Sequence, residues 1–400
     1  MTGTVDYSTP VVILQAAHHG GLGIARSLGR LGAPVYCVDA HWEPAFNSRY
    51  CRRHFVIDIE SAAPSQPVIR LLEIGRQLSG RPILIPTTDL GATWVAEHAP
   101  ALRSEFRFQC QDGTLVRSLC DKSQMQELAR RSGVPTAQSV VPRSKEDVDR
   151  FVETANFPVV VKAIDPDQLR SRAGGTKFII RSGRELLELY ARAGDPEEPN
   201  LLVQEFIPGE DWMFDGYFDQ NSRCVFGVTG KKIRRFPVNT GVTSLGVCLR
   251  NETVERTTAE FMKAIGYHGI LDIGYRYDLR DRQYKVLDVN PRIGCTFRLF
   301  TATNGMDVAR ALYLHLTGQP VPPAPAAEGR KWIVEDFDLF SALRCWRDHT
   351  LTVRDWAKSL RGIQESACFA FDDPLPFLLM PVADCGQWYR WMRHSRAKET

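Results

Sequence analysis

The chain has 400 residues, of which 44% are hydrophobic and 24% are charged, and its formal net charge at pH 7 is +3. This length predicts more than one packed domain, and the composition is typical of a globular protein. A net charge this small gives no reason to expect nucleic acid or an acidic membrane surface as the main partner. No apolar run approaches the ~20 residues of a spanning helix, so we expect no transmembrane segment.

Ten cysteines are dispersed along the chain, without a C-x-x-C pair or a Cys/His cluster at zinc spacing. This spacing favours reduced thiols over a disulfide framework. The first residues, MTGTVDYSTP, lack the basic and then apolar pattern of a signal peptide. We therefore expect a cytoplasmic protein.

Residues 1–115 have the pattern of an α/β domain. The short apolar segments VVILQ, PVYCVDA, FVIDI and PILIPTTD alternate with segments of helical periodicity. Strands that alternate with helices predict a parallel sheet. The segment GGLGIARSLGR follows the first of these strands and opens a helix.

Residues 116–203 predict a smaller subdomain. We expect a helix at residues 121–133, a strand at 158–163, a polar glycine-bearing loop at 167–180 and a helix at 184–194. The loop is polar and contains two adjacent glycines. It would be flexible, as a lid or a hairpin tip is.

Residues 204–320 predict a strand-rich subdomain. Antiparallel pairing is expected around the turn segments DQNSR and RDRQ, and a helix is expected at residues 301–318. The Pro/Ala-rich segment VPPAPAAEG then marks a linker. Residues 321–400 form a C-terminal extension, rich in tryptophan and arginine, that we expect to pack back on the body.

The segment VLDVNPR carries the first candidate site. Alternate side chains of a strand share a face, so Asp288, Asn290 and Arg292 project together. Asp272, in GILDIGYRY, has the parity to join them from a neighbouring strand. Carboxylate and amide oxygens suit Mg²⁺. Polar residues that cap a strand end have the same pattern, and Gly274 marks an alternative position for the acidic ligand.

Three segments before it suit phosphate. Lys162 ends the apolar run FPVVVKA, where a buried ammonium needs an anion or solvent. Lys122 stands at the start of a helix, whose free N–H groups can bind phosphate. Gly174, Gly175 and Thr176 offer backbone N–H groups and a hydroxyl. Each also has a plainer interpretation, as an exposed lysine or a flexible hairpin tip.

Two further segments complete the set. In QEFIPGED, an extended backbone can meet the edge of adenine while Phe206 and Ile207 line its face, and Asp211 can accept hydrogen bonds from ribose. A strand followed by a Pro-Gly turn is the alternative. In the basic run KKIRR, Lys232 can reach a phosphate, although such a run is also typical of a solvated surface.

The order of these motifs over residues 121–318 resembles the ATP-grasp superfamily, specifically its carboxylate–amine ligases. The resemblance implies a Rossmann-like parallel-sheet domain at residues 1–115, a two-subdomain ATP-grasp module with its lid at 116–203 and its catalytic sheet at 204–320, and an extension at 321–400. The implied ligands are ATP and Mg²⁺. The implied roles are phosphate binding for Lys122, Lys162, Gly174, Gly175 and Thr176, adenine binding for Gln204, Glu205, Phe206 and Ile207, ribose binding for Asp211, magnesium binding for Asp272, Asp288 and Asn290, and a catalytic role for Arg292 and Lys232.

The implied reaction joins a small-molecule carboxylate to an amine through an acyl phosphate and releases ADP and phosphate. Amino acids or peptides are the expected substrates, and a homodimer stays open. Two alternatives use the same module: an ATP-dependent carboxylase or carboxylate kinase, and a nucleotide-binding module without turnover.

The segment GGLGIARSLGR supports another alternative, a nicotinamide-dependent dehydrogenase, because its position resembles that of a dinucleotide fingerprint. Arg26 replaces the third glycine, so we favour a helix N-terminus where Arg26 binds a substrate carboxylate. Asp89, in IPTTDLG, follows a strand at the end where α/β sheets bind ligands. It is a candidate for binding the substrate amine, or alternatively the N-cap of the next helix.

Overall fold

The computed structural model describes residues 5–61, 65–78, 80–109, 111–164, 166–175, 177–238 and 241–381. The chain divides into two compact units. The described residues of the first unit fall within 5–120, 212–274 and 289–381, and those of the second within 121–211 and 275–288. The finer division into four domains stays a prediction.

The first unit begins with the parallel sheet that the sequence predicts. Its strand order is β3-β2-β1-β4, and all the pairs are parallel. The predicted strand at residues 55–59 is shifted, because β3 begins at Cys51 and ends at Val56. The elements are β1 (Val11–Leu14), α1 (His18–Gly29), β2 (Val35–Asp39), η1 (Pro44–Asn47), β3 (Cys51–Val56), α2 (Ser65–Gln77), β4 (Ile83–Pro86), α3 (Asp89–Glu97), α4 (Ala99–Leu102) and α5 (Gly113–Cys120).

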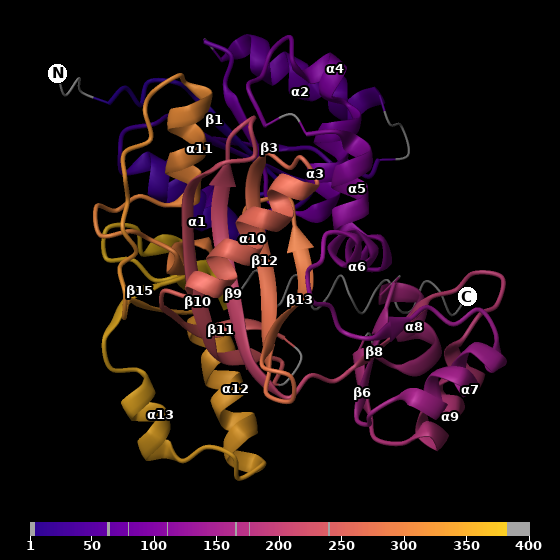
Figure 1. Ribbon diagram of the computed structural model, residues 1–400. Helices are drawn as coiled ribbons and strands as arrows, with labels where there is room; N and C mark the ends of the chain where they lie inside the picture. Colours follow the sequence, from indigo (N-terminus) through magenta and orange to yellow (C-terminus); the bar gives the residue numbers. More distant parts are fainter. Residues whose placement is uncertain are drawn as a thin grey trace. The chain divides into compact units, whose positions relative to one another are not determined.

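A seven-stranded mixed sheet follows, in the order β13-β12-β9-β10-β11-β14-β15. The predicted antiparallel pairing of β9 with β10 is confirmed. The helix α10 lies across one face of this sheet (Figure 1). The elements are β9 (Gly209–Phe218), β10 (Cys224–Phe236), β11 (Val242–Cys248), α10 (Glu252–Ala264), β12 (Gly269–Asp278), β13 (Gln283–Asn290), η2 (Phe297–Leu299) and α11 (Val308–Leu316).

The helix α11 is shorter than the sequence predicts. It begins at Val308 rather than at residue 301, because Asp307 is its N-cap and accepts a hydrogen bond from the backbone N–H of Arg310 at 3.0 Å. An N-cap side chain of this kind satisfies a helix N–H that has no partner within the helix. The six residues before Asp307 instead form irregular chain around Gly305, whose φ is +79°.

The C-terminal extension does more than pack against the body. Its strands β14 (Lys331–Ile333) and β15 (Ile363–Ser366) extend the large sheet, with β14 antiparallel to β11 and β15 parallel to β14. Both are too short for periodicity to reveal them. The helices α12 (Glu335–Arg347) and α13 (Val353–Ser359) are joined to the sheet through Arg234, whose Nε lies 2.8 Å from Asp338 Oδ1.

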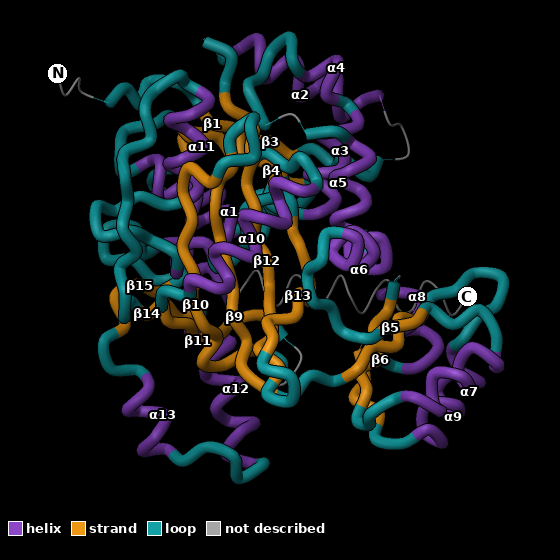
Figure 2. Tube along the Cα trace, viewed as in Figure 1, coloured by secondary structure: helices purple, strands orange, loops and turns teal. Residues whose placement is uncertain are grey.

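The second unit has its own antiparallel sheet, in the order β5-β8-β6-β7 (Figure 2). The loop expected at residues 167–180 is wrong over most of its length, because α8 occupies its first part and β7 occupies its last four residues. The residue after α8 is Gly174, whose φ is +76°. Glycine commonly ends helices in this left-handed conformation. The elements are α6 (Lys122–Arg131), β5 (Ser139–Val140), α7 (Lys145–Thr154), β6 (Val159–Ala163), α8 (Pro166–Ala173), β7 (Lys177–Ile180), α9 (Gly183–Ala193) and β8 (Leu201–Glu205).

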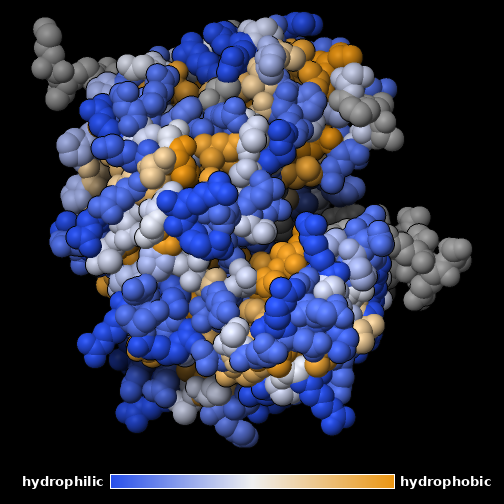
Figure 3. Space-filling model, turned by 45° about the vertical axis from the view of Figure 1, so that its right-hand side comes forward, coloured by the Kyte–Doolittle hydropathy of each residue, from blue (hydrophilic) through white to orange (hydrophobic). Residues whose placement is uncertain are grey.

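The surface drawn in Figure 3 is hydrophilic over most of its area, with smaller hydrophobic patches. None of the helices in the described part of the chain combines the length and the apolar character needed to cross a membrane.

Candidate active site

Four predicted site residues come together in the first unit around the guanidinium of Arg292. Its Nε donates to Asp89 Oδ1 at 2.8 Å, and its Nη2 donates to Asn290 Oδ1 at 3.3 Å. Its Nη1 lies 3.7 Å from Asp272 Oδ2. Asn290 Nδ2 also donates to Asp272 Oδ2, at 3.2 Å. The structure therefore joins two predicted metal ligands and a predicted substrate residue to one arginine.

Asp89 is directed to this cluster because another residue caps its helix. Thr88 is the N-cap of α3 and accepts a hydrogen bond from the N–H of Gly91 at 2.9 Å. The side chain of Asp89 is thus available to Arg292. It keeps 47% of its surface exposed, whereas Arg292 keeps 15%. A carboxylate that is half-exposed beside a buried arginine is well placed to meet a ligand.

The oxygen atoms at this cluster suit a magnesium ion. Asp272 on β12 and Asn290 at the end of β13 are neighbours in the sheet, and Asp272 rather than the residue at 274 contacts Asn290. A Cβ atom at Gly294 would collide with Asp272 Oδ2, so the loop after β13 fits closely over this carboxylate. Within the described ranges, no three His, Cys, Asp or Glu side chains are already gathered for a metal.

Asp215, a buried carboxylate near this cluster, was not predicted from the sequence. Asp215 lies in the middle of β9, is 0% exposed, and neither of its carboxylate oxygens has a hydrogen-bond partner among the described residues. Burial, and then the charge of Asp272, raise the pKa of Asp215 well above its usual value. The sequence feature that could have indicated it is a single aspartate within the apolar segment WMFDGYF. Buried polar groups without partners are rare. A cation bound beside Asp272 would supply the partner that Asp215 lacks.

In the second unit, Lys162 ends β6 and its Nζ donates to Gln204 Oε1 at 2.7 Å. The structure thus brings together a predicted phosphate residue and a predicted adenine residue. Burial, and then the positive charge of Lys177, lower the pKa of Lys162 to about 7, while the charge of Asp288 opposes this shift. A phosphate group would favour the charged form of such a lysine. Lys122 is the first residue of α6, whose N-cap is Asp121.

The predicted nucleotide hinge is held by residues of β12 and of the turn that follows it. Arg276 Nη2 lies 2.6 Å from Asp211 Oδ1, and Arg276 Nη1 donates to the carbonyl of Ile207 at 3.2 Å. The guanidinium of Arg276 lies 5.7 Å from the ring centroid of Phe206. Glu205 accepts a hydrogen bond from Arg280 at 2.9 Å. The adenine and ribose roles of this hinge stay predictions.

Gly174, Gly175 and Lys232 are not part of these clusters. Gly174 and Gly175 follow the end of α8, and Thr176 is outside the described residues. Lys232 is half-buried on β10, opposite Gly246 of β11.

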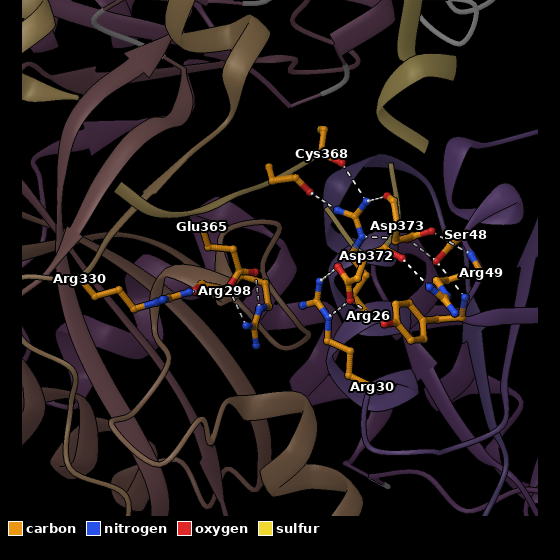
Figure 4. A network of polar contacts seen from close by, with 12 residues as sticks. Arg26, Arg30, Ser48, Arg49, Arg298, Arg330, Glu365, Cys368, Asp372 and Asp373 are labelled. Atoms are coloured by element: carbon orange, nitrogen blue, oxygen red, sulfur yellow. Dashed lines mark hydrogen bonds and ion pairs between the residues drawn. The ribbon is translucent and has the colours of Figure 1, made fainter. Parts of the chain in front are cut away.

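Arg26 has partners inside the chain (Figure 4). It is 4% exposed. Its Nε donates to Asp373 Oδ2 at 2.9 Å, and its Nη2 donates to the carbonyls of Cys368 at 2.9 Å and Asp373 at 2.7 Å. The expected substrate carboxylate is thus replaced by Asp373 of the C-terminal extension. The arginine fixes that extension to α1, and we do not retain it in the site.

Comparisons with solved structures define the class: the chain has the ATP-grasp fold. The L-amino acid ligase from Bacillus licheniformis is 16% identical, with 80% of this chain and 78% of that chain covered and a TM-score of 0.57. The biotin carboxylase domain of 2-oxoglutarate carboxylase from Hydrogenobacter thermophilus, solved as a dimer with MgADP and bicarbonate, is also 16% identical. It covers 80% of this chain and 72% of that chain with a TM-score of 0.59.

In sequence, the chain is similar to the D-aspartate ligase of Enterococcus faecium, with 26% identity in an alignment of 242 positions that covers 57% of each protein. The chain spans 57% or less of the length of the first curated relatives that it matches, several of which are carbamoyl phosphate synthase large chains. No family model matches it.

Proposed function

We propose that the chain is an ATP-dependent carboxylate–amine ligase that forms an amide or peptide bond through an acyl phosphate. The observation that carries the proposal is the cluster of Asp89, Asp272 and Asn290 around Arg292. It combines oxygen ligands for a metal, a cation for a phosphoryl group and a carboxylate for an amine. The similarity to D-aspartate ligase and the fold of L-amino acid ligase support amino acids or peptides as substrates.

The proposed roles of the site residues are those that the sequence predicts. In the second unit, Lys122, Lys162 and the glycines at 174 and 175 bind the phosphates of ATP, and residues 204–207 with Asp211 bind its nucleoside. Asp272, Asp288 and Asn290 are the proposed ligands of Mg²⁺, which when bound neutralises charge on the phosphates. Thr176 and Lys232 remain proposed phosphate contacts.

The protein's part in the chemistry is to position the reactants and offset charge. The substrate carboxylate attacks the γ-phosphorus of ATP, and ADP leaves. The ammonium group of the second substrate loses a proton, the resulting amine attacks the acyl carbon, phosphate leaves, and the nitrogen loses a second proton to give the amide. Arg292 faces the phosphoryl group, while Asp89 holds Arg292 in place and offers its exposed oxygen to the ammonium of the amine substrate.

The test measures ADP release from the full chain with ATP, Mg²⁺ and pairs of amino acids. A ligase releases ADP only when both an acid and an amine are present, and hydroxylamine in place of the amine yields a hydroxamate from the acyl phosphate. ADP release that needs no amine would contradict the proposal.

A carboxylase is the second candidate, because the biotin carboxylase domain with MgADP and bicarbonate has the same fold. It predicts ADP release that requires bicarbonate. A carboxylate kinase predicts ADP release with the acid alone. A nucleotide-binding module predicts ATP binding without ADP release for any substrate.

A homodimer and a cytoplasmic location are part of the proposal. The dimer of the biotin carboxylase domain supports the homodimer. Eight described cysteines that form no disulfide support the cytoplasmic location. Light scattering of the purified chain would give the mass of the assembly, and fractionation of cells would give the location.

A further inference from the structure

Asp215 and Asp272 face each other on neighbouring strands of the large sheet. β9 and β12 are adjacent, and two contacts fix their register: the N–H of Leu279 donates to the carbonyl of Pro208 at 3.3 Å, and Arg276 pairs with Asp211. As the residue number rises along β9 it falls along β12, so the strands run antiparallel. Counting onward from Asp211 and backward from Arg276 by equal steps brings Asp215 opposite Asp272.

Asn290 extends this pair to a row of three oxygen-bearing side chains. β13 is the neighbour of β12 on its other side, and Asn290 Nδ2 donates to Asp272 Oδ2 at 3.2 Å. Side chains at opposite positions of paired strands have Cβ atoms about 4.5–5.5 Å apart. The row therefore runs across β13, β12 and β9 in the order amide, carboxylate, carboxylate, at the spacing of a shared cation.

Asp215 is the member of this row whose carboxylate has no hydrogen-bond partner among the described residues. Asp215 is also fully buried. Arg292 lies 3.7 Å from Asp272, but its Nε is engaged by Asp89 at 2.8 Å. Burying an unpaired carboxylate beside a second one is costly. A divalent cation offsets the charge of two carboxylates at once. It can reach the row from the side of Asp272, because 16% of the Asp272 side chain is exposed.

We propose that Asp215 is a further ligand of the divalent cation, beside Asp272 and Asn290. The inference rests on the magnesium site of the proposed function. It goes beyond that site because Asp215 is in none of the ATP-grasp motifs identified in the sequence. Hard cations such as Mg²⁺ and Mn²⁺ take carboxylate and amide oxygens. Asp215 and Asp272 supply carboxylates, and Asn290 supplies its amide oxygen when its side chain turns Oδ1, which here accepts from Arg292, toward Asp272.

The test is direct binding of Mn²⁺ to the full chain, read from the electron paramagnetic resonance signal of free Mn²⁺, with and without ADP. Asp215→Asn is expected to weaken Mn²⁺ binding by about 10-fold or more. Mutation of residues that only support metal ligands already lowers metal affinity by about 10-fold, and a direct ligand should contribute at least as much. Asp338→Asn is the matched control, because Asp338 is also a 0% exposed carboxylate of the first unit but pairs with Arg234. It should leave Mn²⁺ affinity unchanged.

A thermal shift adds a readout that a merely structural residue would not give. Without metal, Asp215→Asn should melt at or above the wild-type temperature, because the amide carries no charge that could repel Asp272, and Mn²⁺ should no longer raise that temperature. Asp338→Asn should melt lower. Asp215→Ala serves if the asparagine variant does not fold.

Unchanged Mn²⁺ affinity in a folded Asp215 variant would overturn the proposal, including the case where only the KM of the amine substrate rises. So would a wild-type chain that binds no Mn²⁺ with or without ADP. Binding that depends on Asp215 in a protein that never forms an amide would support this site while refuting the ligase activity.

Discussion

Arg292 Nε donates to Asp89 Oδ1 at 2.8 Å, which ties the residue that follows β13 by two positions to the first residue of α3. Elements separated by about half of the chain thereby meet at one ion pair. From the sequence, we expected each of these residues to bind a ligand. The expected ligand is a phosphoryl group for Arg292 and an amine for Asp89. The pair holds both side chains where they can turn to those ligands.

Replacing Asp89 by asparagine should lower kcat/KM for the amine substrate by about 10-fold or more, because the arginine loses a charge-assisted partner and the amine loses a carboxylate. Initial rates at varied amine concentration measure this. Glu97→Gln is the matched control on the same helix, since Glu97 pairs with Arg117 at the surface. Equal losses in both variants would remove Asp89 from the site.

Nucleotide affinity should depend on pH through Lys162. Its pKa in the free protein is lowered to about 7 by burial, and a bound phosphate would raise that pKa. The affinity for ADP should therefore fall as pH rises from about 7 toward 9, where free Lys162 is neutral. Calorimetric titrations at several pH values would show this slope in wild type and a flatter one in Lys162→Met. A parallel slope in the variant would assign the pH dependence to another group.

The same lowered pKa has a consequence for stability. Between about 7 and the ordinary lysine pKa, the unfolded chain binds a proton that the folded chain does not, so this group makes the protein more stable as pH rises through that window. Nucleotide-free wild type should gain stability relative to Lys162→Met from pH 7 to pH 9. Urea unfolding at both pH values measures the difference. A constant difference would mean that Lys162 is not buried in this way.

Asp288→Ala should reduce magnesium-dependent ADP release by about 100-fold, because charge stabilisation at a transferring phosphoryl group is worth that much. Steady-state ADP release across a range of Mg²⁺ concentrations is the measurement. Asp281→Ala, in the turn before β13, removes a carboxylate with 41% of its side chain exposed and should have little effect. Full magnesium-dependent turnover in Asp288→Ala would remove Asp288 from the metal site.

Arg26→Ala should reduce stability rather than substrate binding. Breaking a buried ion pair costs about 3–5 kcal/mol because the partner charge stays buried, and Asp373 is 2% exposed. Urea unfolding should show this loss, whereas Arg30→Ala should cost much less because Arg30 and Asp372 are partly exposed. The KM for the acid substrate should be unchanged in folded Arg26→Ala. A raised KM without loss of stability would restore Arg26 to the substrate site.

The sequence predicted the parallel sheet and most strands of the large sheet, because apolar runs such as VVILQ and GILDIGYRY have clear periodicity. It missed β14 and β15, which are short and gain their partners only through distant chain segments. It also missed α8, because a polar segment that ends in two glycines was interpreted as a loop. Short elements are decided by tertiary packing, which local pattern does not contain.

At the candidate site, too, the sequence pattern predicts local features but not contacts between distant segments. Asp272, Asn290, Arg292 and Asp89 were identified from strand parity and strand ends, and they do meet. Parity could not show that Arg26 faces Asp373, since its partner lies 347 positions away. Nor could it show that Asp215 faces Asp272, because the register of β9 with β12 is a property of the sheet.

The most direct test of the central claim uses an acid substrate labelled with ¹⁸O in its carboxylate. An acyl phosphate transfers one carboxylate oxygen to the phosphate that leaves, so mass spectrometry should find one ¹⁸O atom in the released phosphate for each amide formed. Unlabelled phosphate released together with the amide would contradict the acyl-phosphate route, and labelled phosphate without any amide would contradict the ligase.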